Sequence, residues 1–194
     1  DVHRGRHISI CETYLRPRAL VRTISFELWG ECLVVYAYSF SLLEAGARDR
    51  SLSIALSPLR HHQSTSRVLI EADASAVAQA ICFAPEGTER VMRTETRLNG
   101  TGARSEDIAR MVSAGGRIVN DALLIGAAGG SQGFLGCDGL KLGDAGEIMA
   151  VPSLQAQAEG AQLSHEAAQA DELQRPPAAH HLRLACLACG ANVQ

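Results

Sequence analysis

The sequence predicts an all-β protein: a right-handed parallel β-helix that ends in a short C-terminal helical segment. Three observations support this fold class. Short apolar runs of strand length recur along the chain without long helices between them. Glycine occurs at 18 positions, most of them after residue 86, which indicates many tight turns. Aromatic residues make up only 4% of the chain, so small aliphatic side chains must fill the narrow interior of a stacked structure.

The chain divides into three regions. Residues 1–40 are expected to supply the first strands of the solenoid, because 21–40 is rich in β-branched and aromatic side chains and is split at Gly30-Glu31. Residues 41–170 are expected to form the β-helix core. Strands are predicted there at 52–56, 67–72, 76–83, 89–97, 117–125, 139–142, 147–151, 154–158 and 161–164. Residues 171–194, where an apolar run follows a Pro-Pro pair, are expected to form a helical tail.

The connections between strands favour a solenoid over hairpins. A hairpin fold needs repeated Asn-Gly or Asp-Gly turns between long alternating strands. Asn99-Gly100 and Asp138-Gly139 have the right residues, but no long strand precedes the second pair. Residues 126–163 are rich in alanine and punctuated by glycine, which fits stacked turns with small inward side chains.

The composition excludes several classes of partner and compartment. The chain has 18 basic and 21 acidic side chains and a net charge of −3, so neither nucleic acid nor an anionic membrane is an expected partner. Its longest apolar stretch, 32–40, is shorter than the roughly 20 residues that span a bilayer. Six cysteines are scattered irregularly, unlike the dense framework of a small secreted protein. We therefore expect a cytoplasmic protein with free thiols.

One glycine-rich segment imitates a dinucleotide-binding motif. Residues 122–133 run from an apolar strand into closely spaced glycines, as nucleotide-binding folds begin. That chemistry requires a helix directly after the glycines. Four further glycines between 136 and 146 oppose a helix there. A nucleotide-binding oxidoreductase is therefore the least favoured of the functions considered.

One other group of residues could bind a metal ion. Cys186 and Cys189 form half of a zinc pattern, and His180 and His181 precede them at an unusual spacing. We expect the two cysteines to pack as small apolar residues, since free cysteine is commonly buried. His61-His62 is expected to lie in a turn or on the surface.

Cys137 and the His165-Glu166 pair form the strongest candidate site. Thiolate, imidazole and carboxylate can all ligate iron, and each must be deprotonated at the ligating atom. The two parts are 28 residues apart. If a turn of the solenoid has about that length, they lie on neighbouring strands about 4.8 Å apart. The alternative is a buried cysteine beside a hydrogen-bonded histidine.

Residues 131–168 resemble the closing turns of the SufB/SufD family of SUF iron–sulphur cluster assembly scaffolds. The steps occur in the family's order: Ser131-Gln132-Gly133-Phe134-Leu135-Gly136-Cys137-Asp138-Gly139-Leu140, then Val151-Pro152-Ser153-Leu154, then Ala161-Gln162-Leu163-Ser164-His165-Glu166-Ala167. Upstream, 98–104 resembles a Gly-x-Gly-Ala turn of the family. The resemblance extends over residues 40–170, and the Cys-Asp and His-Glu steps are more similar to SufB than to SufD.

The resemblance implies a scaffold rather than an enzyme. It implies that Cys137 accepts sulphur and ligates a transient iron–sulphur cluster, with Glu166 and His165 as further ligands. Implied partners are a cysteine desulfurase that donates sulphur, a second SufB/SufD-type subunit or a homodimer mate, and a SufC-like ATPase. The family also has a cysteine further upstream through which sulphur enters. It has no clear match here, and Cys82 is a candidate by chain position alone.

The sequence departs from the family in its last residues. The motif that docks the SufC-like ATPase is not found after the His-Glu step, where Pro176-Pro177 would end a helix early. One internal segment also conflicts with the implied fold, because Ser105-Glu106-Asp107 and the apolar residues after it are typical of a capped amphipathic helix. We follow the resemblance and predict a strand there. A β-solenoid interaction module without cluster chemistry stays the main alternative function.

Overall fold

The computed structural model describes residues 5–172, and this part of the chain consists of twelve β-strands joined by turns. The odd-numbered strands are β1 (Gly5–Leu15), β3 (Leu33–Leu43), β5 (His61–Ile70), β7 (Glu89–Leu98), β9 (Arg117–Gly126) and β11 (Glu147–Ala156). The even-numbered strands are β2 (Leu20–Glu27), β4 (Arg48–Ala55), β6 (Ser75–Pro85), β8 (Arg104–Ala114), β10 (Gln132–Leu142) and β12 (Gln162–Glu172).

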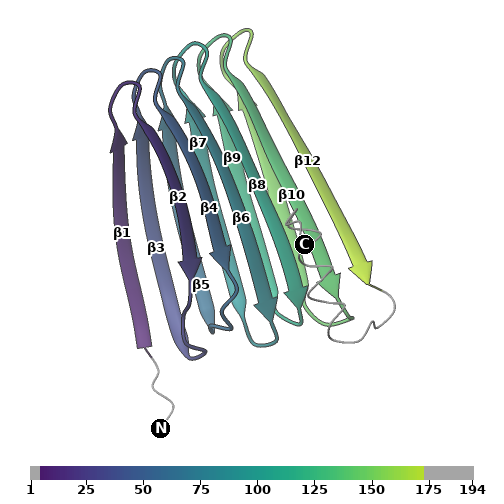
Figure 1. Cartoon of the computed structure of the whole chain (residues 1–194). Coiled ribbons are helices and arrows are strands. Elements are labelled where there is room, and N and C mark those ends of the chain that lie inside the picture. The colour runs from purple at the N-terminus through teal and green to yellow at the C-terminus, as the bar shows by residue number, and fades with distance from the viewer. Residues whose placement is uncertain (1–4, 173–194) are drawn as a thin grey trace, which may run out of the picture.

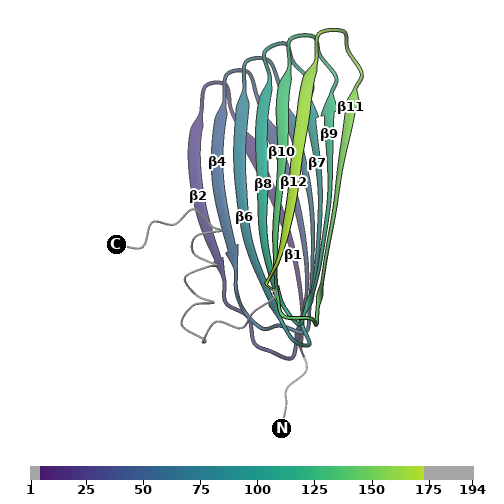
Figure 2. The same cartoon turned by 90° about the vertical axis from the view of Figure 1, so that its right-hand side faces the viewer.

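The strands form two parallel sheets that face each other (Figures 1 and 2). Sheet A has the order β1-β3-β5-β7-β9-β11, and sheet B has the order β12-β10-β8-β6-β4-β2. The chain alternates between the sheets, so each strand pairs with the strand two places further along the sequence. The result is a parallel β-solenoid of about six turns, as the sequence predicts.

One full turn is typically 28 residues long. His61 pairs with Glu89, and Glu89 pairs with Arg117, at that separation in both cases. Each connection from sheet A to sheet B has a residue of positive φ at the same place: Arg18, Gly46, Asp73, Gly102, Gly130 and Gly160. Glycine adopts this left-handed conformation without steric cost, which explains why the glycine spacing follows the turns.

Apolar side chains form rows along the solenoid axis where the strands of sheet A end. Leu15, Leu43, Ile70 and Leu98 lie opposite one another on successive strands and are buried together. Removing each of these side chains from water contributes about 1.5–3 kcal/mol. A second buried cluster, at the other end of the strands, contains Cys82, Ala84, Ala109, Met111, Ile118 and Cys137.

The middle of the interior is polar. A cavity of about 460 Å³ lies between the sheets and is lined largely by small hydroxyl and alanine side chains, among them Ser39, Ser51, Ser53, Ser64, Ser66 and Thr94. The two apolar clusters therefore enclose a polar centre.

The local predictions have different outcomes. Gly30-Glu31 does separate two strands, β2 and β3. The segment from Ser105 that resembles a capped helix is strand β8, because its inward side chains pack between the strands on either side. The helical tail predicted for 171–194 lies outside the described residues, apart from the end of β12. In residues 5–172 no helix is long and apolar enough to cross a membrane.

Candidate functional site

Cys137 lies on β10 with its side chain directed into the solenoid, and only 3% of the residue is exposed. On the neighbouring strands it is opposite Ala109 and Ala167. Both neighbours have a single methyl group as side chain, so they leave space around the sulphur atom. The thiol is free.

Asn120 reaches Cys137 from the opposite sheet. Its Nδ2 donates a hydrogen bond to Cys137 Sγ over 3.3 Å. Asp107 lies on β8 and also faces the interior, in the row of side chains next to that of Cys137. Burial raises the pKa of the Cys137 thiol, the carboxylates of Asp107 and Asp138 raise it further, and the bond from Asn120 lowers it. The site thus favours the protonated thiol, and Asn120 is the group that favours the thiolate.

A hollow of about 390 Å³ lies beside Cys137, at the end of the solenoid that β11 and β12 close. Its lining comes from four strands and comprises Met111, Cys137, Gly139, Glu147, Ile148, Met149, Ala150, Ala167, Ala168 and Gln169. This space gives a small ligand access to the sulphur atom. It is largely apolar, with Glu147 and Gln169 as its polar members.

His165 and Glu166 lie on β12, the strand next to Cys137, and both are exposed. His165 is opposite Leu135, whereas Cys137 is opposite Ala167. Because side chains alternate along a strand, His165 lies on the same face as Cys137, two positions away along the strand. Glu166 is opposite Gly136 and lies on the other face of the sheet. The structure therefore places Cys137 and His165 on one face of adjacent strands and Glu166 on the other.

The offset has a local cause. The last turn is 30 residues long, so Gln132 pairs with Gln162 and Arg117 pairs with Glu147. The two additional residues lie in the connection 143–146, where Gly143 and Gly146 both have positive φ. The corresponding connection one turn earlier consists of residues 115–116 alone. The 28-residue spacing between Cys137 and His165 therefore does not place them directly opposite each other.

A second group of buried polar side chains lines the polar cavity near the starts of β5 and β7. Arg90 is 1% exposed and donates from Nε to the carbonyl of Phe83 and from Nη2 to the carbonyl of Ser57. Arg90 Nη1 lies 3.2 Å from His62 Nδ1. The same His62 Nδ1 lies 3.1 Å from Glu27 Oε2. Burial and the positive charge of Arg90 lower the pKa of His62 to about 4, so the imidazole is neutral.

Cys82 borders this group but does not suit a role in sulphur acceptance. The residue is 1% exposed, and burial raises the pKa of its thiol to about 12. A nucleophilic or metal-binding cysteine must reach the thiolate form and be accessible. Burial and the raised thiol pKa therefore argue against Cys82 more strongly than they argue against Cys137, whose sulphur lies beside an open hollow.

The other candidate residues from the sequence either have structural roles or lie outside the described part of the chain. His61 Nδ1 pairs with Glu89 at 2.8 Å on the outside of sheet A. His62 is buried, so the prediction of a turn or surface position is wrong for this residue. The segment 122–133 forms the end of β9, a turn and the start of β10, without the helix that a dinucleotide site requires. Cys186, Cys189, His180 and His181 lie outside the described residues.

Within residues 5–172 no group of three or more His, Cys, Asp and Glu side chains is arranged to hold a metal ion.

Sequence reasoning did not identify Asn120 or Asp107 as neighbours of Cys137. Both face the interior from other strands, and their proximity depends on the register of the sheets. A 28-residue repeat relates Asp107 to Leu135, which is two residues before Cys137, so this neighbour could have been found from the sequence. No signal in the sequence relates Asn120 to Cys137 across the interior.

A family model and the curated relatives of this chain point to the same protein family. Residues 2–172 match the family model described as SUF system FeS cluster assembly, SufBD core domain. An iron–sulfur cluster assembly SufBD family protein of Archaeoglobus fulgidus is 32% identical over 84% of this chain and 44% of its own length. Two SufBD family proteins from strains of Methanothermobacter thermautotrophicus are each 29% identical over 87% of this chain and 42% of their own length. The chain thus spans less than half the length of these curated relatives.

Proposed function

The chain belongs to the SufBD core domain family of the SUF system, and from that premise we propose that it is a scaffold for iron–sulphur cluster assembly. In this role it receives sulphur and iron, holds a nascent cluster and passes it to apo-proteins. The cluster is cargo, and the chain is not itself an enzyme. The observation that carries the proposal is the free Cys137 thiol beside an open hollow in the last turns of the solenoid.

We assign Cys137 as the sulphur acceptor and an iron ligand, with His165 and Glu166 as further ligands. Diagonal neighbours on adjacent strands have Cα atoms about 7–8 Å apart, which is within the reach of a Cys and a His side chain that share a metal ion. Support for His165 comes from its position on the Cys137 face of β12. Glu166 lies on the opposite face, so it would reach a shared ion only around the exposed edge of β12 or from another subunit.

The arrangement also supports assembly with a second subunit. A cluster needs several thiolate or imidazole ligands, and one subunit offers few of them near Cys137. Strand β12 pairs with β10 on one side, and β11 pairs with β9 on one side, so each exposes a free edge in the described part of the chain. A second SufB/SufD-type subunit, or a second copy of this chain, would cover these edges and complete the ligand set.

Other partners are proposed from the family alone. A cysteine desulfurase would donate the sulphur, and a SufC-like ATPase would be a further partner. The cytoplasm is the compartment proposed for this chain. Neither nucleic acid nor a membrane is required.

Anaerobic reconstitution with ferrous iron and sulphide tests the proposal. The wild-type chain should gain visible thiolate-to-iron absorbance and retain iron after desalting. Cys137→Ser should lose both, and His165→Ala and Glu166→Ala should each retain less iron. Cys11→Ser is the matched control, because Cys11 is an exposed free thiol on β1, at the other end of the solenoid.

The main alternative is a β-solenoid interaction module without cluster chemistry. It is favoured by the protonated state of the Cys137 thiol and by the lack of a three-ligand group within residues 5–172. A wild-type chain that retains no iron, alone or with a SufB/SufD-type partner, would support this alternative. Iron retention that is lost equally in the Cys137→Ser and Cys11→Ser variants would argue against the assigned site.

A further inference from the structure

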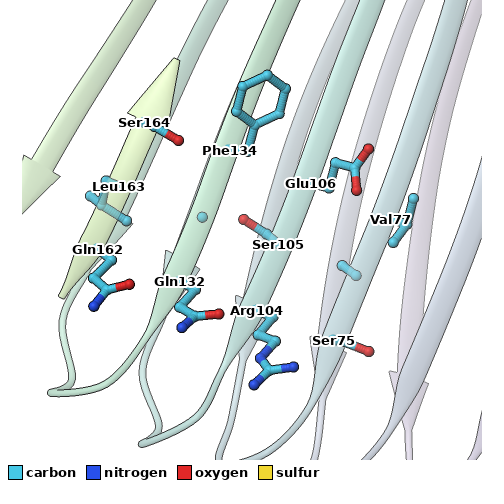
Figure 3. Close-up of a pocket in the computed structure, with 12 residues that line it drawn as sticks. Ser75, Val77, Arg104, Ser105, Glu106, Gln132, Phe134, Gln162, Leu163 and Ser164 are labelled. Atoms are coloured by element: carbon cyan, nitrogen blue, oxygen red, sulfur yellow. The ribbon is translucent and has the colours of Figure 1, made fainter. Parts of the chain in front are cut away.

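The outer face of sheet B carries a groove that runs across the strands near their N-terminal ends. It consists of two adjoining hollows of about 550 and 460 Å³ that share Ser75, Val77 and Arg104. Figure 3 shows the larger hollow, in which two rows of side chains cross neighbouring strands. One row contains Ser75, Arg104, Gln132 and Gln162, and the other contains Val77, Glu106, Phe134 and Ser164.

Four arginines gather at the β2–β8 end of this groove. Arg48 and Arg50 lie on one face of β4, and Arg22 on β2 is directly opposite Arg50. Arg104 on β8 lies in the same row as Arg48, with Ser75 of β6 between them. All four are exposed. Among the described residues none of them forms an ion pair, although Asp49 and Asp73 also line the smaller hollow.

Four exposed guanidinium groups close to one another favour the binding of an anion. Like charges directly opposite each other on neighbouring strands repel, as Arg22 and Arg50 do. The chain as a whole has a net charge of −3, so the arginines form a local positive surface on a molecule that is otherwise slightly acidic. Arginine binds carboxylates through two parallel hydrogen bonds, which gives such a surface both affinity and orientation.

The shape of the groove selects an extended chain over a small anion. From β4 to β12 it crosses five adjacent strands. At about 4.8 Å between strands this is roughly 19 Å, the length of about six residues in extended conformation. At the β12 end Gln132 and Gln162 can hydrogen-bond a peptide backbone and Phe134 offers apolar contact, while Val77 on β6 offers apolar contact nearer the arginines.

We propose that this groove binds an extended acidic segment of a protein partner, with its acidic residues over Arg48, Arg50 and Arg104. Glu106 lies within the groove and would repel a continuous phosphate backbone, so a peptide fits better than nucleic acid. Cys137 faces the interior of the same sheet. The groove on the outside can therefore be occupied while the interior site is free.

Fluorescence anisotropy tests the proposal with the whole chain and a labelled six-residue probe, Glu-Asp-Glu-Ser-Gln-Ser. We expect saturable binding that weakens as NaCl is raised, and much weaker binding of the matched probe Gln-Asn-Gln-Ser-Gln-Ser. The triple variant Arg48→Gln, Arg50→Gln, Arg104→Gln should lose about tenfold in affinity, because exposed ion pairs are individually weak. Phe134→Ala should reduce affinity for both probes alike.

The control is the triple variant Arg6→Gln, Arg60→Gln, Arg93→Gln, which removes the same charge from three exposed arginines outside the groove. It should bind the acidic probe within twofold of the wild type. Far-ultraviolet circular dichroism checks that both triple variants keep their strands. An equal loss in the two variants would overturn the proposal, as would no binding of the acidic probe at millimolar concentration. A six-residue oligothymidylate that binds more tightly than the acidic probe would assign the groove to nucleic acid instead.

Discussion

Asn120 of sheet A and Cys137 of sheet B are joined across the interior by a hydrogen bond of 3.3 Å from the amide Nδ2 to the sulphur atom. The two residues are 17 positions apart in the chain and come from consecutive strands. An amide N–H that points at sulphur stabilises the thiolate more than the thiol. Asn120 is therefore a positioning residue for whatever chemistry Cys137 performs.

Asn120→Ala should make the Cys137 thiol less reactive. Without the amide donor the pKa of the thiol rises further, so less thiolate is present at a given pH. We expect alkylation of Cys137 by iodoacetamide at pH 8, followed by peptide-resolved mass spectrometry, to slow several-fold. Asn120→Asp should slow it more, because a carboxylate repels the thiolate. Asn99→Ala, which removes a half-buried amide in the turn after β7, should leave the rate unchanged, and a faster rate in Asn120→Ala would contradict this role.

Cys137→Ser should abolish cluster retention with little change in thermal stability. Serine is close to cysteine in size, and its hydroxyl can accept the hydrogen bond from Asn120. We expect the free energy of unfolding to change by no more than about 1 kcal/mol. Thermal melts of apo-protein, with iron content measured after reconstitution, separate the two effects. A large loss of stability would show that Cys137 is primarily a packing residue.

His62 should make the fold sensitive to acid. In the folded chain its pKa is about 4, against 6.5 when unfolded, so the unfolded state takes up a proton first as the pH falls. Stability should therefore decrease between pH 6.5 and pH 4, by up to about 3 kcal/mol from this residue. Urea unfolding at pH 7, 5.5 and 4.5 should show a smaller decrease for His62→Gln than for the wild type. Equal pH dependence in the two proteins would refute the assignment.

Asp107 should make the fold less stable at high pH, whereas His62 makes it less stable at low pH. Burial raises the pKa of its carboxyl group to about 6 from 3.8 in the unfolded chain. The stability that this group contributes is present below pH 3.8 and is lost as the pH rises through 6. Asp107→Asn should therefore be more stable than the wild type by up to about 3 kcal/mol at pH 8 and nearly equal to it at pH 4. The exposed control Asp121→Asn should show no such gain. A destabilised Asp107→Asn at pH 8 would contradict the conclusion that desolvation disfavours the Asp107 carboxylate.

The closing strands should mediate self-association. Met149 and Val151 are 41% and 42% exposed on the outer face of β11, next to its free edge. Light scattering over a concentration series should show a dimer for the wild type and weaker association for Met149→Lys with Val151→Lys. The same charge placed at the opposite end of sheet A, by Ile8→Lys with Ile10→Lys, should have less effect. A strictly monomeric wild type at high concentration would exclude this interface.

Much of the fold can be read from the sequence because its signals are local. The recurring positive-φ glycines and the strand-length apolar runs indicate stacked turns, and the Gly30-Glu31 break separates β2 from β3. The segment from Ser105 is different, because its spacing of apolar residues suits a helix. Strand pairing on both sides determines its conformation, and no local pattern reports such contacts.

The candidate site is less accessible to sequence reasoning. The separation of Cys137 from His165 predicts adjacent strands, and the structure has them on β10 and β12. It does not predict their offset, which depends on the length of one turn. Nor does it predict Asn120, because a contact across the interior depends on how the two sheets face each other.

The connection 143–146 takes up its two additional residues outside the strands. Glu147 begins β11 opposite Arg117, just as Arg117 begins β9 opposite Glu89, so the alignment of the strand starts does not change. Spacing in the sequence and position along a strand are therefore uncoupled in the last turn, because His165 is the fourth residue of β12 whereas Cys137 is the sixth residue of β10. A connection in this solenoid can thus change its length without altering the packing of the strands that it joins.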